Sequence, residues 1–154
     1  MFDALKSFFT KVSQVDDEIK FDENDHRLAT AALLTHAMHS DGVTRDSERE
    51  AIKNSLIKQY NVSEDELKEL MTGGEQADNS SVDFYAFTSV LKRELDQEGR
   101  EKIVEMLWDV VLADGVIHEL EDNVVWRVAE LLGVETRRRV MLRQKVEAKL
   151  TASN

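Results

Sequence analysis

An acidic pattern, D-G-V-x-x-[DE]-x-E, occurs twice in this sequence and limits the choice of fold more than any other feature. The first copy runs from Asp41 to Glu48 and the second from Asp114 to Glu121. Matching acids are equally spaced, because the separation of Asp41 from Asp114 equals that of Glu48 from Glu121. Apolar residues at helical spacing precede and follow both copies. The repeat indicates a duplicated helical unit.

The spacing of apolar residues predicts helices throughout. The chain of 154 residues contains no proline, which breaks helix interiors, and only 6% aromatic residues, which are enriched in strands. Ser63 and Glu66 stand in the positions of a capping box. Residues 72–79 hold two of the six glycines and are predicted to form a loop. The predicted helices cover residues 2–12, 26–40, 45–60, 63–71, 82–95, 100–113, 119–132 and 135–150.

These elements predict one all-α domain over residues 1–154, a helical bundle of about eight helices in two pseudo-symmetric repeats. The first repeat is expected at about 26–71 and the second at about 100–148, after an N-terminal helix and acidic linker over 1–25. The chain has no cysteine, which excludes disulfides, zinc–thiolate sites and thiol redox chemistry. Trp108 and Trp126 flank the second acidic turn, and we expect both in the core.

A formal net charge of −11 restricts the partners of the chain. It repels nucleic-acid phosphates and anionic membrane surfaces, and it attracts cations and basic proteins. No apolar run approaches the ~20 residues of a membrane span, and no signal-peptide features stand at the start. We therefore expect a cytoplasmic protein without nucleic-acid partners. The apolar stripe of the N-terminal helix is expected to pack on the bundle; lying on a membrane is the less favoured alternative.

Each acidic turn is predicted to join two antiparallel helices and to bring its Asp and Glu together. The Asp stands at a helix C-terminus, where the helix dipole disfavours an anion by about 0.3–1 kcal/mol. Either an Asx turn or a bound cation would offset this cost. In an Asx turn, Asp41 would accept hydrogen bonds from the amides of Val43 or Thr44. A purely structural role, as turn and helix cap, remains the alternative to a metal site.

If the turns bind an ion, carboxylate oxygens favour a hard one, Ca²⁺ or Mg²⁺. An EF-hand is excluded because Ala37 and His39 stand where its loop needs its first oxygen ligands. Whether the two turns form one site or two is left open. If they converge, repulsion should raise the pKa of each acid in the absence of a cation. The candidate ligands are Asp41, Glu48, Asp114 and Glu121, with Asp46 and Glu119 as weaker candidates.

The two turns resemble those of the tellurite-resistance TerB family. The resemblance rests on SDG at residues 40–42 followed by Glu48, and on ADG at residues 113–115 followed by Glu121. It extends over about residues 28–132 and implies an all-α bundle of two repeats. It also implies a divalent-metal site formed by the four acids, within bacterial stress-response systems tied to tellurite tolerance. Tellurite is an oxyanion that this acidic chain should repel, so we expect any effect on tolerance to be indirect.

The last predicted helix is basic, and two interpretations remain open. Arg137, Arg138, Arg139 and Arg143 either bind an acidic protein partner or form salt bridges with the acidic part of the chain. His36 and His39 lie one helical turn apart, but the second repeat does not keep this pair, so packing is favoured over metal binding. No nucleophile motif or zinc-protease pattern is present, and we expect no enzyme.

Together, these features favour a non-catalytic stress-response module that binds a divalent cation through its duplicated acidic turns. The first alternative is a metal-independent protein-interaction or scaffold domain. A metal-dependent hydrolase is the weaker one.

Overall fold

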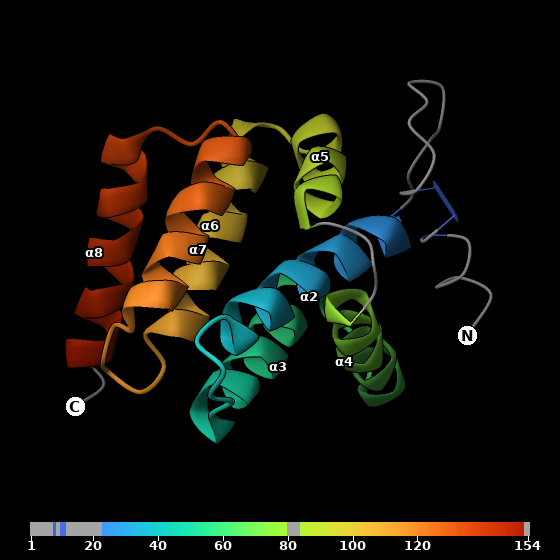
Figure 1. Cartoon of the computed structure of the whole chain (residues 1–154), viewed down its shortest axis with the longest axis horizontal. Helices are drawn as coiled ribbons and strands as arrows, with labels where there is room; N and C mark the ends of the chain where they lie inside the picture. Colours follow the sequence, from blue (N-terminus) through green and yellow to red (C-terminus); the bar gives the residue numbers. More distant parts are fainter. Residues whose placement is uncertain (1–7, 9, 12–22, 80–83, 153–154) are drawn as a thin grey trace.

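The computed structural model describes residues 8, 10–11, 23–79 and 84–152, and the secondary structure in these parts is helical throughout. The all-α prediction is therefore confirmed, and Figure 1 shows the arrangement of the helices. The described helices are α2 (Glu23–His39), α3 (Asp46–Tyr60), α4 (Glu64–Asp78), α5 (Phe84–Glu94), α6 (Gln97–Val111), α7 (Glu119–Leu131) and α8 (Thr136–Ala152).

Helix α2 lies at the centre of the fold and contacts α3, α4, α5, α6 and α7 (Figure 1). Its sequence ATAALL, residues 29–34, is entirely buried. The three alanines in this run have small side chains, so neighbouring helices can approach α2 closely on several sides. A helix buried all round needs apolar residues on every face. The composition of α2 therefore explains its central place.

Helix α4 continues to Asp78, so the loop predicted over residues 72–79 is wrong. Gly73 and Gly74 lie inside this helix and are buried. A Cβ atom on Gly74 would stand 2.5 Å from Thr35 Oγ1 and 2.9 Å from the carbonyl oxygen of Ala31. Both atoms belong to α2. The glycine thus permits close contact between two helices instead of a chain reversal.

The helices before and after α5 correspond in order. Helices α2, α3 and α4 match α6, α7 and α8, and the bounds of each pair are offset by a nearly constant number of positions. Helix α4 packs against α2, and α8 packs against α6 in the same way. The order and packing of the helices agree with two repeats, while the repeats and their duplication stay predictions.

The N-terminal part of the chain touches this bundle at Phe8. Its ring is buried and stacks on Phe87 of α5, with ring centroids 5.8 Å apart. Lys11 forms an ion pair of 2.7 Å with the buried Asp25 of α2. Residues 2–7, 9 and 12 of the predicted helix over residues 2–12 lie outside the described residues. At Phe8, therefore, the stripe packs on the bundle.

The two tryptophans differ in burial, and the prediction that both lie in the core is wrong for one of them. Trp108 is buried, and its Nε1 donates a 3.1 Å hydrogen bond to the carbonyl oxygen of Arg139. Trp126 is 45% exposed because it follows Val125 on α7 and lies beside the buried stripe of that helix. Trp108 is thus the better reporter of core packing.

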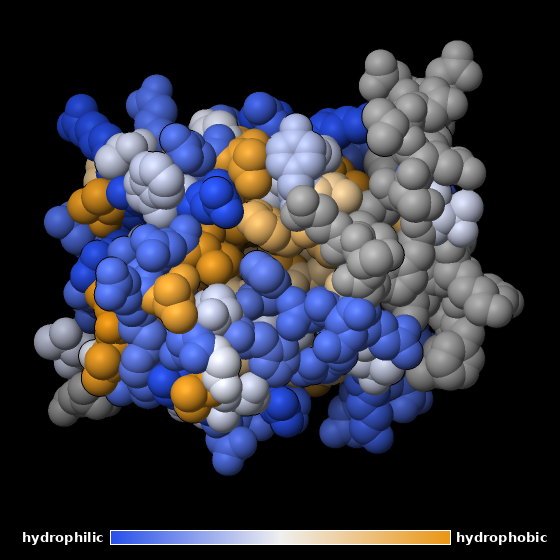
Figure 2. Space-filling model, viewed as in Figure 1, coloured by the Kyte–Doolittle hydropathy of each residue, from blue (hydrophilic) through white to orange (hydrophobic). Residues whose placement is uncertain are grey.

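The visible surface in Figure 2 is largely hydrophilic, with hydrophobic atoms near the centre and along the left side of the view. This agrees with the high content of charged residues, 33% of the chain. Within the described ranges, none of the helices combines the length and apolar character needed to cross a membrane.

Candidate metal centre

The two acidic turns have the same backbone geometry. Gly42 and Gly115 adopt φ angles of 78° and 82°, in the left-handed region that suits glycine because it has no Cβ. The valine after each glycine projects into solvent, with Val43 52% and Val116 56% exposed. These two hydrophobic side chains contribute no core contacts, so the turns keep their shape through polar interactions.

Each turn is closed by its aspartate. The Asp41 carboxylate accepts a 3.0 Å hydrogen bond from the amide of Val43, and the Asp114 carboxylate accepts one of 3.0 Å from the amide of Val116. These are Asx turns, one of the two alternatives that the sequence left open. They offset part of the unfavourable interaction between each carboxylate and the C-terminus of the preceding helix. The aspartates therefore have a structural role independent of any ion.

The glutamate of each turn is buried at the start of the next helix. Glu48 on α3 is 1% exposed and Glu121 on α7 is 0% exposed. The positive end of the helix dipole favours an anion at these positions. Yet Glu48 Oε2 and both carboxylate oxygens of Glu121 are buried without a hydrogen-bond partner. A buried carboxylate in this condition is costly unless a cation or a proton neutralises it.

Arg45 joins the two turns into one site. Its Nη1 lies 2.9 Å from Asp41 Oδ2, 3.2 Å from Glu48 Oε1 and 3.9 Å from Glu121 Oε1. Its Nε lies 3.6 Å from Asp114 Oδ2. We call these four acids the acidic cluster. The two turns therefore converge, because four carboxylates from both turns lie within 3.9 Å of a single guanidinium group.

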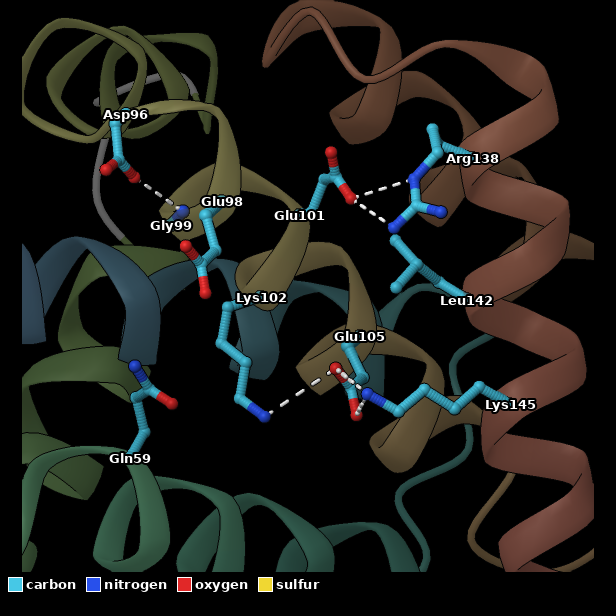
Figure 3. Close-up of a pocket in the computed structure, with 10 residues that line it drawn as sticks. All are labelled: Gln59, Asp96, Glu98, Gly99, Glu101, Lys102, Glu105, Arg138, Leu142 and Lys145. Carbon is cyan, nitrogen blue, oxygen red and sulfur yellow. Dashed lines mark hydrogen bonds and ion pairs between the residues drawn. The ribbon is translucent and has the colours of Figure 1, made fainter.

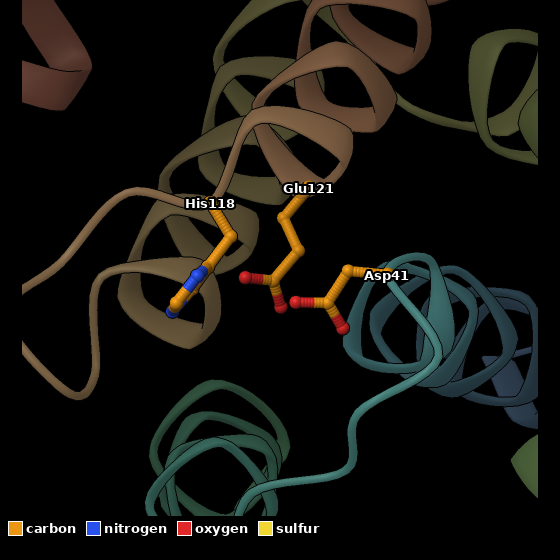
Figure 4. Close-up of side chains that lie close together, drawn as sticks. All are labelled: Asp41, His118 and Glu121. Atoms are coloured by element: carbon orange, nitrogen blue, oxygen red, sulfur yellow. The ribbon is translucent and has the colours of Figure 1, made fainter.

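His118 completes the site from the second turn. Its Nε2 lies 3.0 Å from Asp114 Oδ2. Figure 4 shows its ring beside the facing carboxylates of Asp41 and Glu121. One ligand atom from each of these three residues lies within 4.8 Å of the other two. A Ca²⁺ ion with ligands at about 2.3–2.6 Å can span such distances. The donor set therefore fits a divalent cation.

Glu121 carries the largest electrostatic perturbation of the site. Its burial, followed by a hydrogen bond that the protonated acid makes with the Glu48 carboxyl group and by the charges of Glu48 and Asp41, raises the pKa of Glu121 from 4.5 to about 9. The nearby guanidinium of Arg45 acts in the opposite direction without reversing this shift. At neutral pH and without a bound ion, Glu121 therefore holds a proton, as expected for converging acids.

The two aspartates behave differently. Burial opposes ionisation of Asp41, but the Val43 amide and Arg45 outweigh it and lower the pKa of Asp41. Burial likewise opposes ionisation of Asp114, but His118 and a backbone amide outweigh it and lower the pKa of Asp114. The prediction that every acid has a raised pKa is therefore wrong for the aspartates, because hydrogen-bond donors and cations stand beside them.

A model of the family described as tellurite resistance protein TerB matches residues 27–144. The chain belongs to the TerB family. This match includes both acidic turns and supports a tellurite-resistance-like module. Neither the curated proteins nor the solved structures that were compared with this TerB-family chain gave a match.

The weaker metal candidates of the TerB-family chain lie apart from the acidic cluster. Asp46 and Glu119 are the first residues of α3 and α7, and both are exposed. Among the described residues, no hydrogen bond or ion pair joins either of them to the cluster. Each precedes its buried glutamate by two residues, so a helix turns the two side chains in different directions.

Two histidines of α2 bind separate carboxylates of α4. His36 Nδ1 lies 2.9 Å from Asp78 Oδ1, and His39 Nε2 lies 2.9 Å from Glu75 Oε2. The two acids are one helical turn apart, as are the histidines. These paired contacts hold α4 against α2, which agrees with the packing role favoured by the sequence.

The basic last helix of this TerB-family chain is largely paired within the molecule. Arg138 reaches Glu101 at 2.6 and 2.9 Å, across a groove of about 640 Å³ between α6 and α8 (Figure 3). Arg143 pairs with Glu147 at 3.3 Å, and Arg139 lies 5.5 Å over the ring of Trp126. The fourth, Arg137, is exposed.

Two residues at the acidic cluster were missed by sequence reasoning, Arg45 and His118. They occupy matching positions of the repeat, because each follows the aspartate of its own turn by four residues. Both are basic. The sequence did hold a signal for them, because a basic residue occurs at the same position of both acidic motifs. It indicates a counter-charge for the acids around it.

Proposed function

We propose that this chain is a non-catalytic, tellurite-resistance-like stress-response module that binds a divalent cation at the acidic cluster. One observation carries the proposal. The buried glutamates Glu48 and Glu121 come from different turns, three of their oxygen atoms lack hydrogen-bond partners, and Arg45 Nη1 lies within 3.9 Å of both side chains. A divalent cation would replace the proton on Glu121, neutralise both carboxylates and supply the missing partners.

The chemistry of the donors favours a hard ion. Asp41 and Glu121 have carboxylate oxygens close enough together to hold it, with Glu48 and Asp114 beside them around Arg45, and such oxygens suit Ca²⁺ or Mg²⁺. His118 offers one nitrogen in addition. The bound ion would supply positive charge that links the turn between α2 and α3 to the turn between α6 and α7. Ion binding would thus stabilise the contact between the two halves of the bundle.

A thermal melt tests the proposal directly. The protein is treated with EDTA, and Ca²⁺ or Mg²⁺ is then added at constant ionic strength while the fluorescence of buried Trp108 follows unfolding. Binding to the folded state at 100 times Kd adds about 2.7 kcal/mol of stability. In a domain of this size, this raises the melting temperature by roughly 5–10 °C. A saturable rise supports an ion site, and a flat response to both ions contradicts it.

Two double variants locate the site. Asp114→Asn with Glu121→Gln removes two members of the acidic cluster and should abolish the rise. Asp46→Asn with Glu119→Gln makes the same change of charge at exposed positions of the same turns and should leave the rise intact. Equal loss in both variants would show a general effect of charge and no site at the cluster.

The second candidate function is a metal-independent protein-interaction domain. It is favoured by the position of Arg45, because an internal cation already neutralises part of the acidic cluster. In this case the acids serve only as turns and helix caps, and the exposed Arg137 belongs to the partner-binding face. No ion would then stabilise the protein, and Arg137→Glu would weaken capture of an acidic protein partner.

A further inference from the structure

We infer that Arg45 is the resident counter-cation of the acidic cluster, and that a divalent ion binds there by displacing its guanidinium group. The inference rests on the proposed function, and it names competition with Arg45 as the factor that sets the affinity of the site for the ion. Arg45 would act as a competitor of the ion and not as a neutral neighbour.

The contacts of Arg45 place its charge where an ion would lie. Its Nη1 is within 3.9 Å of oxygens from Asp41, Glu48 and Glu121, three of the four acids. A divalent ion bound by the same oxygens would stand within a few ångströms of the guanidinium. Like charges at such a separation repel strongly in a partly buried site. Both cannot occupy the centre of the cluster together.

Arg45 can leave without breaking the fold around it. Its side chain is 21% exposed, so the guanidinium has a path to solvent. Arg45 is the N-cap residue of α3, but its side chain makes no capping hydrogen bond. Besides its contacts with the acids, its guanidinium makes a long contact of 3.4 Å with the carbonyl oxygen of Val43 and one of 3.5 Å with His118. The attraction of the acids is therefore the main interaction that an ion must replace.

The matching residue of the second turn has the complementary chemistry. His118 stands at the position equivalent to Arg45, and a neutral imidazole can offer a lone pair to a metal. A guanidinium has no such lone pair and stays charged. One turn therefore contributes a ligand, and the other contributes a competing charge. This asymmetry predicts that the natural chain binds ions weakly and responds only when their concentration is high.

Calorimetric titration of the full chain with Ca²⁺ and with Mg²⁺ tests the inference. Arg45→Gln removes the charge while keeping a polar side chain, and it should tighten binding by at least about tenfold. Arg45→Lys keeps a positive charge and should bind about as weakly as the natural chain. Arg137→Gln makes the same change of charge away from the cluster and should also leave the affinity unchanged.

The displacement itself is observed by NMR of the arginine side chains. As Ca²⁺ saturates the natural chain, the Nε–H signal of Arg45 should move toward the position of an exposed arginine, while that of Arg137 stays in place. The Arg45→Gln spectrum assigns the signal. An Arg45 signal that keeps its position at saturation would overturn the inference.

The outcomes separate this inference from the proposed function. If the natural chain binds an ion and Arg45→Gln binds it no more tightly, the competition is refuted and the ion site stands. If only Arg45→Gln binds, the competition is supported and the natural chain is not an ion-binding module. If neither binds, both ideas fail. Should Arg45→Gln not fold, Arg45→His brings in the residue of the matching position and is expected to bind at least as tightly as the natural chain.

Discussion

Arg45 Nη2 lies 3.5 Å from His118 Nδ1, where the two acidic turns meet. Each of these residues pairs with the aspartate of its own turn, Arg45 with Asp41 at 2.9 Å and His118 with Asp114 at 3.0 Å. The halves of the bundle thus meet through two basic side chains that pair with acids of both turns. One of these side chains carries a permanent charge and the other does not, so the site is asymmetric although its backbone is repeated.

Glu121 should make the ion-free protein less stable as pH rises. Its pKa is raised to about 9 in the folded chain from an ordinary value of 4.5. The folded state therefore binds a proton that the unfolded state has lost between these values. The contribution to stability is fully present below about pH 4.5 and is lost as pH rises toward 9, by at most about 1.4 kcal/mol per pH unit.

Urea denaturation in EDTA measures how the stability changes with pH. The range should run from about pH 5 to about pH 9, which the two pKa values set. Glu121→Gln imitates the protonated acid and should be less sensitive to pH than the natural chain, so the two stability curves diverge as pH rises. Parallel curves over the whole range would contradict the raised pKa.

Asparagine and alanine at position 114 should separate the two roles of the aspartate. Asp114→Asn keeps an oxygen that accepts the amide of Val116, so the Asx turn and most of the stability should remain. Asp114→Ala loses that hydrogen bond and should cost about 0.5–1.5 kcal/mol. Chemical denaturation compares the ion-free variants, and equal stability of the two would show that the Asx turn contributes nothing.

Gly74→Ala should destabilise the contact between α4 and α2 by about 1–3 kcal/mol, because the new methyl group would overlap Thr35 Oγ1 and the Ala31 carbonyl. Thermal unfolding measures the change. Thr35→Ala in the same chain removes the nearer atom and should restore part of the loss. Full stability of the single variant would mean that the two helices separate at little cost.

Arg138→Ala should lower stability more than Arg137→Ala, although the two residues are neighbours on α8. Arg138 donates two hydrogen bonds to Glu101 Oε1, whereas Arg137 is exposed. Since the Arg138 side chain is 43% exposed, the difference should stay within about 1 kcal/mol. A double-mutant cycle with Glu101→Gln isolates this pair, and a coupling energy of zero would contradict its contribution.

The sequence predicts most of the fold because apolar spacing and turn glycines are local signals. The capping box at Ser63 is present, with its hydroxyl 3.2 Å from the amide of Glu66. The loop prediction for residues 72–79 was wrong because Gly74 is required by close packing against α2, a different helix. A pair of glycines indicates a turn when only its neighbours in sequence are considered, yet here it is the surface of α2 that requires them.

The acids of the candidate site were also predictable, whereas its centre was not. Asp41, Glu48 and their counterparts follow from the repeated pattern. The convergence of both turns on Arg45 depends on how the halves pack, which no local pattern encodes. The exposure of Trp126 was unpredictable for a similar reason, since a hydrophobic residue beside the buried stripe of a helix can be either buried or exposed.

The position of Arg45 also has a consequence for the order in which the chain folds. The helix pairs α2–α3 and α6–α7 can form from contacts close in sequence, but Arg45 and Glu121 belong to different halves of the chain. Contacts between residues so distant in sequence must overcome a larger loop-closure entropy. Until the halves dock, Glu121 lacks the guanidinium of Arg45. Closure of the acidic cluster is therefore expected to be a late kinetic step.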